Sequence, residues 1–155
     1  AFRAFLDDYS DDYDAKWNEY TYNGRGEPFF TYGGFKRTIN FSFKISAQSR
    51  WEMMPLYRKL NYLVSQTAPD YKGNRMRGNF QKLTIGHMVD RTPGIITKVG
   101  LKWQKDYPWE IALDQDSTEN IGQDKNMLIL PHVLDVSVSL EHPTASAEEI
   151  CLIAV

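Results

Sequence analysis

The residues of this chain best suited to nucleophilic catalysis or metal binding are three histidines and one cysteine. His87, His132 and His142 are dispersed, and Cys151 has no second thiol with which to form a disulfide or a cysteine-based metal site. The sequence contains no His-x-x-x-His, Cys-x-x-Cys or Gly-x-Ser-x-Gly motif and no phosphate-binding glycine motif. We therefore predict no catalytic, cofactor-binding or metal-binding residues, and we expect a protein that is not an enzyme.

Carboxylates are the next candidates, because paired acids catalyse proton transfer and oxygen-rich loops bind cations. Four oxygen-bearing side chains loosely resemble a cation loop: Asp114, Asp116, Thr118 and Asn120. The stretch lacks the glycine and the terminal glutamate of the calcium pattern, so we interpret residues 114–126 as a solvated loop. Glu110 and Asp135 are isolated carboxylates, and their spacing predicts no acid–base pair.

The composition fits one globular domain of 155 residues. The formal net charge of −2 excludes a global basic surface for duplex DNA or an anionic membrane, and no apolar run approaches the roughly 20 residues that span a bilayer. Aromatic residues make up 14%, an enrichment typical of strands and interfaces. Because the chain starts without Met and residues 150–155 are apolar, we expect a processed chain, a fragment, or ends that pack against neighbours.

Three long segments alternate between apolar and polar residues, which predicts strands. In residues 35–45 one face carries Phe35, Ile39, Phe41, Phe43 and Ile45, and the other carries Lys36, Thr38, Asn40, Ser42 and Lys44. Arg37 is the single break on the apolar face. The second segment, residues 95–104, has one face of Ile95, Thr97, Val99, Leu101 and Trp103.

The third alternating segment is residues 130–141. Its apolar face carries Leu130, Leu134, Val136, Val138 and Leu140, and its polar face carries Asp135, Ser137, Ser139 and Glu141. His132 falls on the apolar face, where a hydrogen-bonded core or interface histidine is favoured over a metal ligand. Shorter strands are predicted at residues 29–32, 83–85 and 107–111, with turns at 23–28, 33–34 and 92–94.

One amphipathic helix is predicted over residues 49–64. Ser49 and Glu52 have capping-box spacing, Pro55 should kink the helix or delay its regular start, and Pro69 lies beyond its end. One apolar stripe recurs at three- and four-residue steps: Met53, Leu56, Tyr57, Leu60, Leu63 and Val64. Such a stripe is more often core than cofactor site, so the helix should cover one face of a sheet.

Two polar segments each allow two interpretations. Residues 7–14 are acidic and carry spaced tyrosines, which favours a solvated helix or loop over an arm that docks its tyrosines on a partner. Residues 70–79 look like a loop made locally basic by Lys72, Arg75 and Arg77. A solvated loop or subunit contact is favoured there over a phosphate contact, because no stacking pattern accompanies the charges.

These elements predict a mainly β fold of six or so strands with one flanking helix, arranged as an antiparallel sandwich or small barrel. Long alternating strands and many aromatics suit a subunit of an oligomer, because sheet edges must be paired or covered and a closed ring of subunits does so.

Several short blocks, in their order along the chain, resemble one protein family. They are Gly24–Glu27, Phe35–Ile45, Ala47–Leu63, Ala68–Tyr71, Leu83–Gly86, Pro93–Thr97, Pro108–Ile111 and Leu130–Val136. Together they are similar to the tail-tube-like domain of baseplate proteins from contractile-tailed bacteriophages, the tube initiator and tube cap family. The resemblance covers roughly residues 18–142, leaving an acidic N-terminal arm, residues 1–17, and a C-terminal segment, residues 143–155.

The resemblance implies a structural virion protein, a hexameric ring at the junction of baseplate and tail tube. Each subunit of the family adds strands to an inner β-barrel around a channel, with a helix on the outer side. The neighbours would be baseplate hub and tube ring proteins, with DNA only as transient cargo and no membrane or cofactor. The polar faces that include Lys36 and Asp135 are then candidates for lining the lumen.

Three other hypotheses stay open. The chain could be a tail tube or ring subunit of a related contractile injection or secretion system, which the sequence separates poorly from a phage ring. A small-ligand-binding β-barrel would need an apolar cavity with a few convergent polar groups. An enzyme, such as a cell-wall hydrolase of the same particle, would need a clustered His, Asp or Glu site.

Overall fold

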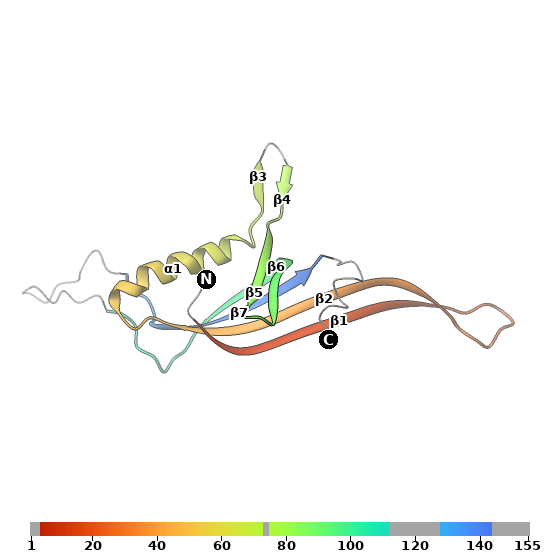
Figure 1. Ribbon diagram of the computed structural model, residues 1–155, viewed down its shortest axis with the longest axis horizontal. Helices are drawn as coiled ribbons and strands as arrows, with labels where there is room; N and C mark the ends of the chain where they lie inside the picture. Colours follow the sequence, from red (N-terminus) through yellow and green to blue (C-terminus); the bar gives the residue numbers. More distant parts are fainter. Residues whose placement is uncertain (1–3, 73–74, 112–127, 144–155) are drawn as a thin grey trace, which may run out of the picture.

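A computed structural model describes residues 4–72, 75–111 and 128–143. Its elements are β1 (Phe5–Tyr20), β2 (Phe29–Ser46), α1 (Arg50–Ser65), β3 (Asp70–Lys72), β4 (Arg75–Arg77), β5 (Phe80–Ile85), β6 (Val89–Trp103) and β7 (Val133–His142). Five strands form one antiparallel sheet in the order β1-β2-β7-β6-β5, and β3 and β4 form a separate hairpin (Figure 1). The predicted mainly β fold with one helix is confirmed. A sandwich or barrel is not confirmed, because no sheet among the described residues is closed.

The core lies on one face of the sheet, centred on β2 and β7. Their register sets Ile39 opposite Leu140 and Phe43 opposite Val136, so the two predicted apolar faces meet across one ladder. Directly opposed apolar side chains on one face are the unit that stabilises a sheet. The buried cluster consists of Ile39, Phe43, Ile45, Leu60, Ile96, Leu134, Val136, Val138 and Leu140.

Helix α1 covers this apolar face, as the stripe predicts (Figure 1). Met53 and Leu60 are buried, and Leu60 belongs to the core cluster. The N-terminus differs from the predicted capping box: the Ser49 side chain makes no cap hydrogen bond, and the Glu52 carboxylate accepts one from the Gln48 backbone N–H at 3.0 Å. The helix begins at Arg50, so Pro55 does not delay its start.

Strand pairing overrides three local turn or loop signals. Residues 7–14, predicted as a helix or loop, lie within β1 and pair with β2 along its length. Residues 33–34, predicted as a turn, lie within β2, where Gly33 is skipped in the register as a β-bulge. Residues 92–94 lie within β6, and Pro93 precedes the β6–β7 ladder, so its missing N–H leaves no gap there.

Other predictions change in detail. Residues 70–72 and 75–77, predicted as parts of a loop, pair as strands β3 and β4. The strand predicted at 107–111 is reduced to a single bridge between Trp109 and Pro131. A register shift between Ile96 and Lys98 splits the predicted face of β6, so Ile96 and Val99 both contact the core. The solvated loop at 114–126 and most of the C-terminal segment lie outside the described residues.

Strand β1 is continuous from Phe5 to Tyr20 and passes through the predicted boundary between residues 17 and 18. Its ladder with β2 contains two register shifts, between Leu6 and Asp8 and between Lys16 and Trp17. The acidic residues 7–14 therefore form part of the five-stranded sheet.

Replacing Gly94 with Ala is expected to lower the free energy of unfolding by about 2 kcal/mol, because overpacking a core costs 1–3 kcal/mol. Gly94 is buried, and a Cβ there would overlap the side chain of the buried Leu140. The control is Gly78→Ala, because a Cβ at Gly78 meets nothing within 4 Å. Urea unfolding of both variants measures the difference, and equal stabilities would contradict the predicted clash.

Candidate functional site

The two polar faces predicted from the sequence are one surface. In the β2–β7 register Thr38 lies opposite Glu141 and Lys44 lies opposite Asp135, and directly opposed residues share a face of the sheet. The neighbouring strands extend this surface: Asp12 on β1 pairs with Thr38, and Lys98 on β6 pairs with Ser139. The polar surface is thus four strands wide, and it lies on the side of the sheet opposite the core.

The polar surface is balanced in charge. By strand register it carries five carboxylates and five amines, a net charge of zero: Asp8, Asp12, Asp14, Asp135 and Glu141 against Lys16, Lys36, Lys44, Lys98 and Lys102. Lys36 Nζ lies 3.4 Å from Glu141 Oε1, and Lys44 Nζ lies 3.9 Å from Asp135 Oδ1. Such cross-strand pairs leave the surface hydrophilic without a strong field of either sign.

The far end of the β1–β2 pair is a separate feature, which we call the distal ribbon: residues 14–20 of β1, residues 29–36 of β2 and the connecting loop. β7 pairs with β2 from Arg37 onward, so among the described residues these parts of β1 and β2 pair only with each other (Figure 1). An isolated two-stranded ribbon is marginally stable in water. The distal ribbon therefore needs support from its side chains or from a partner.

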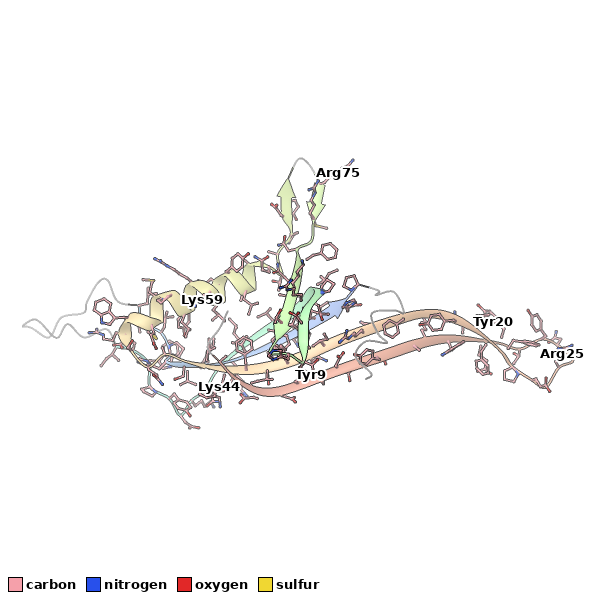
Figure 2. All side chains as sticks on the ribbon, viewed as in Figure 1. Tyr9, Tyr20, Arg25, Lys44, Lys59 and Arg75 are labelled. Carbon is pink, nitrogen blue, oxygen red and sulfur yellow. The ribbon has the colours of Figure 1, made fainter. Side chains whose placement is uncertain are left out.

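Aromatic side chains occupy both faces of the distal ribbon, each 41–64% exposed: Trp17, Tyr20, Tyr22, Phe29, Phe30 and Tyr32. Trp17 and Tyr32 meet edge to face with centroids 5.1 Å apart, and Tyr22 meets Phe29 at 5.4 Å. The Arg25 guanidinium lies 5.7 Å from the Phe29 centroid, at the end where Figure 2 labels Tyr20 and Arg25. Exposed apolar surface gathered in this way is typical of a protein–protein interface.

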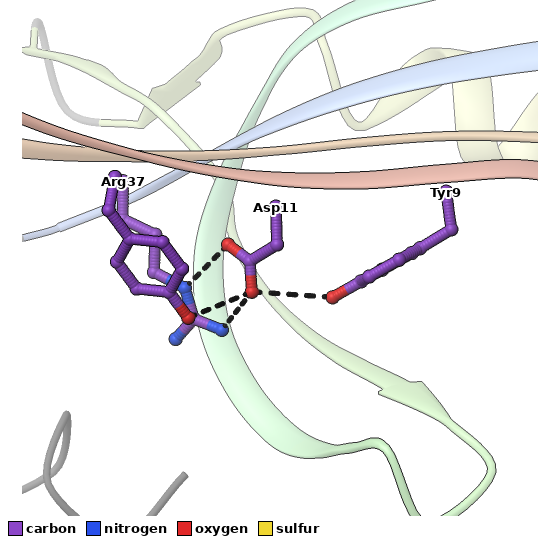
Figure 3. A network of polar contacts seen from close by, with 4 residues as sticks. Tyr9, Asp11 and Arg37 are labelled. Atoms are coloured by element: carbon purple, nitrogen blue, oxygen red, sulfur yellow. Dashed lines mark hydrogen bonds and ion pairs between the residues drawn. The ribbon is translucent and has the colours of Figure 1, made fainter. Parts of the chain in front are cut away.

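A polar network fastens β1 to β2 where the distal ribbon begins (Figure 3). Arg37 Nε donates to Asp11 Oδ1 at 2.9 Å and Nη2 donates to Oδ2 at 2.6 Å. The hydroxyls of Tyr13 and Tyr9 donate to the same carboxylate at 3.0 and 3.4 Å, and the guanidinium lies 5.0 Å from the Tyr13 centroid. The side chains of Arg37 and Asp11 are only 5% and 16% exposed, so this ion pair is nearly buried.

Burial acts on Asp11 to raise its pKa, but the hydrogen bonds from Arg37 and Tyr13 and the Arg37 charge outweigh it and lower the pKa below 3.8. The same pairing raises the pKa of Arg37. Burial, together with the Asp11 charge, raises the pKa of both Tyr9 and Tyr13 above 10.0. The network is therefore ionised at Asp11 and Arg37 and neutral at the two phenols at physiological pH.

The histidines do not converge. His87 is exposed in the turn after β5, and His142 is buried at the end of β7 opposite Arg37. His132 is hydrogen-bonded, as predicted: its Nδ1 lies 3.3 Å from the Ala47 carbonyl oxygen. Within residues 4–72, 75–111 and 128–143, no group of three His, Cys, Asp or Glu side chains could hold a metal ion.

The two carboxylates predicted to be isolated both have partners. Glu110 Oε2 lies 3.4 Å from His132 Nε2, and Glu110 Oε1 lies 3.7 Å from Arg50 Nε. Asp135 accepts a hydrogen bond from Gln104 Nε2 at 2.7 Å. Because these contacts join the segment after β6 to α1 and to β7, they fasten the fold together. Asp114, Asp116, Thr118, Asn120 and Cys151 lie outside the described residues.

A surface groove bears on the ligand-binding hypothesis. Its volume is about 440 Å³, and its lining includes Phe5, Ser46, Glu52, Pro55, Leu56 and Lys59. Most of these residues are exposed, and the lining includes both an acid and an amine. A small-molecule site is instead expected to be concave, largely apolar and enclosing.

Sequence reasoning missed the distal ribbon and the Asp11–Arg37 pair. A signal for the pair was present, because an arginine on an apolar strand face needs a carboxylate partner. The partner, however, lies 26 positions away in a segment that was not expected to be a strand.

A search of protein-family models gives no match to this chain, and no curated protein is significantly similar to it. In the part of the chain that the structure describes, no helix has the length and apolar character needed to cross a membrane.

Proposed function

We propose that this chain is a structural ring subunit of a contractile-tailed bacteriophage, acting as a hexamer at the junction of baseplate and tail tube. There it templates tube assembly and lines the channel through which DNA passes. The observation that carries the proposal is the four-strand polar surface backed by an apolar face under α1. A sheet with one hydrophilic face and one helix-covered face suits the wall of an aqueous channel.

The open sheet supports ring closure. β1 and β5 are the two edge strands of the five-stranded sheet, so each has a strand neighbour on one side only among the described residues. Natural proteins pair or cover such edges, and a head-to-tail ring pairs every edge with its complement. The barrel that the single chain does not close would then be formed by six copies, with the baseplate hub and tube rings stacked above and below.

The charge balance of the polar surface supports DNA passage. Each phosphate that a protein neutralises releases counterions and strengthens binding, so a strongly basic lumen would retain the polymer. With five carboxylates against five amines, the polar surface offers no such attraction. The same features would serve a contractile injection system, so the proposal extends to that class of particle.

The distal ribbon supports stacking contacts outside the sheet. Its aromatics lie on both faces of a two-stranded extension, which the rest of the described chain leaves exposed. Burying several of them on a neighbouring subunit would supply the aromatic anchors that interfaces use.

Light scattering after size exclusion, with negative-stain imaging, tests the proposal over a concentration series of the purified chain. We expect rings with a central hole and a mass near 108 kDa, six times the 18.0 kDa of one chain. A compact monomer at every concentration would contradict the proposal and favour the ligand-binding hypothesis.

A further inference from the structure

The β3–β4 hairpin is a small projection from the fold (Figure 1), and its two faces carry different side chains. Tyr71 pairs with Met76, and these side chains are 74% and 70% exposed. Arg75 and Arg77 flank Met76 and therefore lie on the other face, where both are exposed (Figure 2 labels Arg75). Each strand has only three residues, and a two-stranded pair is marginally stable on its own, so a partner that covers it would stabilise the hairpin.

The chemistry of the hairpin defines its partner. Two arginines spaced two residues apart on one face call for two carboxylates at the same spacing, roughly 6.7 Å along a strand. Tyr and Met on the opposite face call for an apolar or aromatic surface. The partner must present both surfaces side by side, as the two faces of a strand at a sheet edge do.

Strand β1 has these properties. It is an edge strand in which Asp12 and Asp14, both exposed, lie two residues apart on the polar surface, and Tyr13, 43% exposed, lies between them on the other face. Residues 5–20 contain six acids and one lysine. Such an edge repels a second copy of itself and attracts a strand of opposite charge.

We propose that the β3–β4 hairpin of one copy docks on the β1 edge of the next copy, with Arg75 and Arg77 facing Asp12 and Asp14. Sheet order gives the reason for a second copy. β4 leads into β5, which is the edge strand farthest from β1 in the order β1-β2-β7-β6-β5. A head-to-tail arrangement brings the β5 side of one molecule to the β1 side of the next. The inference rests on the proposed ring and names the contact that closes it.

Charge reversal tests this contact, using the full chain and the ring assay. Arg75→Glu/Arg77→Glu and Asp12→Lys/Asp14→Lys should each raise the concentration for half-assembly at least tenfold. An equimolar mixture of the two variants should restore rings, because every interface in an alternating ring then joins opposite charges. The matched control is Arg58→Glu/Lys59→Glu on the exposed side of α1, which should leave assembly unchanged. Circular dichroism checks that each variant keeps its fold.

The outcomes separate this inference from the ring proposal. If the unaltered chain forms rings and both charge-reversed variants form them equally well, the hairpin contact is wrong and the ring proposal stands. Absence of rings from the unaltered chain would overturn both. If the arginine variant forms normal rings but loses affinity for a fluorescent single-stranded oligonucleotide, the hairpin is a phosphate contact and the inference is wrong.

Discussion

Replacing Asp11 with Ala is expected to lower the free energy of unfolding by about 3 kcal/mol, measured by urea denaturation below the concentration at which the chain assembles. Removing one partner of a buried ion pair costs 3–5 kcal/mol because the other charge stays buried. Arg37, at 5% side-chain exposure, would be that charge. The expected loss lies at the lower end of this range because water reaches the Asp11 side chain, which is 16% exposed.

Two controls separate the effect of losing the Asp11–Arg37 ion pair from the effect of replacing any carboxylate in β1. Asp8→Ala removes an exposed carboxylate of the same strand and should change stability by less than about 0.5 kcal/mol. The double variant Asp11→Leu/Arg37→Met replaces the pair with apolar side chains on the apolar face and should recover most of the loss. If Asp11→Ala costs no more than Asp8→Ala, the pair does not hold β1 to β2.

The same pair predicts acid sensitivity. The pKa of Asp11 is lowered in the folded state, so its contribution is complete well above the ordinary value of 3.8 and is lost as the pH falls below that value. Asp11→Asn, which cannot titrate, should be less stable than the parent at neutral pH. The gap should narrow as the pH falls toward 2, and a gap that stays constant with pH would contradict this assignment.

The sequence predicted the elements in which apolar residues recur at regular spacing. β2, β7 and α1 each bury one regular face, so period-two and helical patterns marked Phe43, Val136 and Leu60 before any contact was known. Strand register then joined two separately predicted polar faces into one surface, a step that no single segment encodes.

The sequence failed where long-range pairing decides the conformation. The local sequence of β1 is acidic and indicates a solvated segment. Its strand conformation depends on the ladder with β2 and on Arg37, which lies 26 positions away from Asp11. Gly33 and Pro93 are local turn signals, yet a bulge accommodates one and a position before the β6–β7 ladder accommodates the other. The exposed aromatics of the distal ribbon could not be distinguished by type from core aromatics until β7 was seen to end opposite Arg37.

Replacing both Trp17 and Tyr32 with Ser is expected to weaken assembly at least a hundredfold while leaving the monomer folded. These residues are 58% and 55% exposed, and their aromatic ring centroids lie 5.1 Å apart. In the monomer, their loss therefore removes only the attraction between the two aromatic side chains, about 1 kcal/mol. In an interface, two aromatic anchors are worth about 2 kcal/mol each, and 1.4 kcal/mol is a factor of ten in affinity.

The matched control for the distal ribbon is Trp51→Ser, which removes an indole that is 90% exposed near the start of α1. Because α1 lies on the side of the sheet away from the polar surface, this change should leave the concentration for half-assembly within about twofold of the parent, well under the tenfold that 1.4 kcal/mol gives. Light scattering reports assembly and urea unfolding reports the monomer. If the ribbon variant assembles like the parent, its aromatics serve no contact between subunits. If Trp51→Ser weakens assembly as much as the ribbon variant does, α1 belongs to the interface, and the position expected for it on the outer side of the ring is wrong.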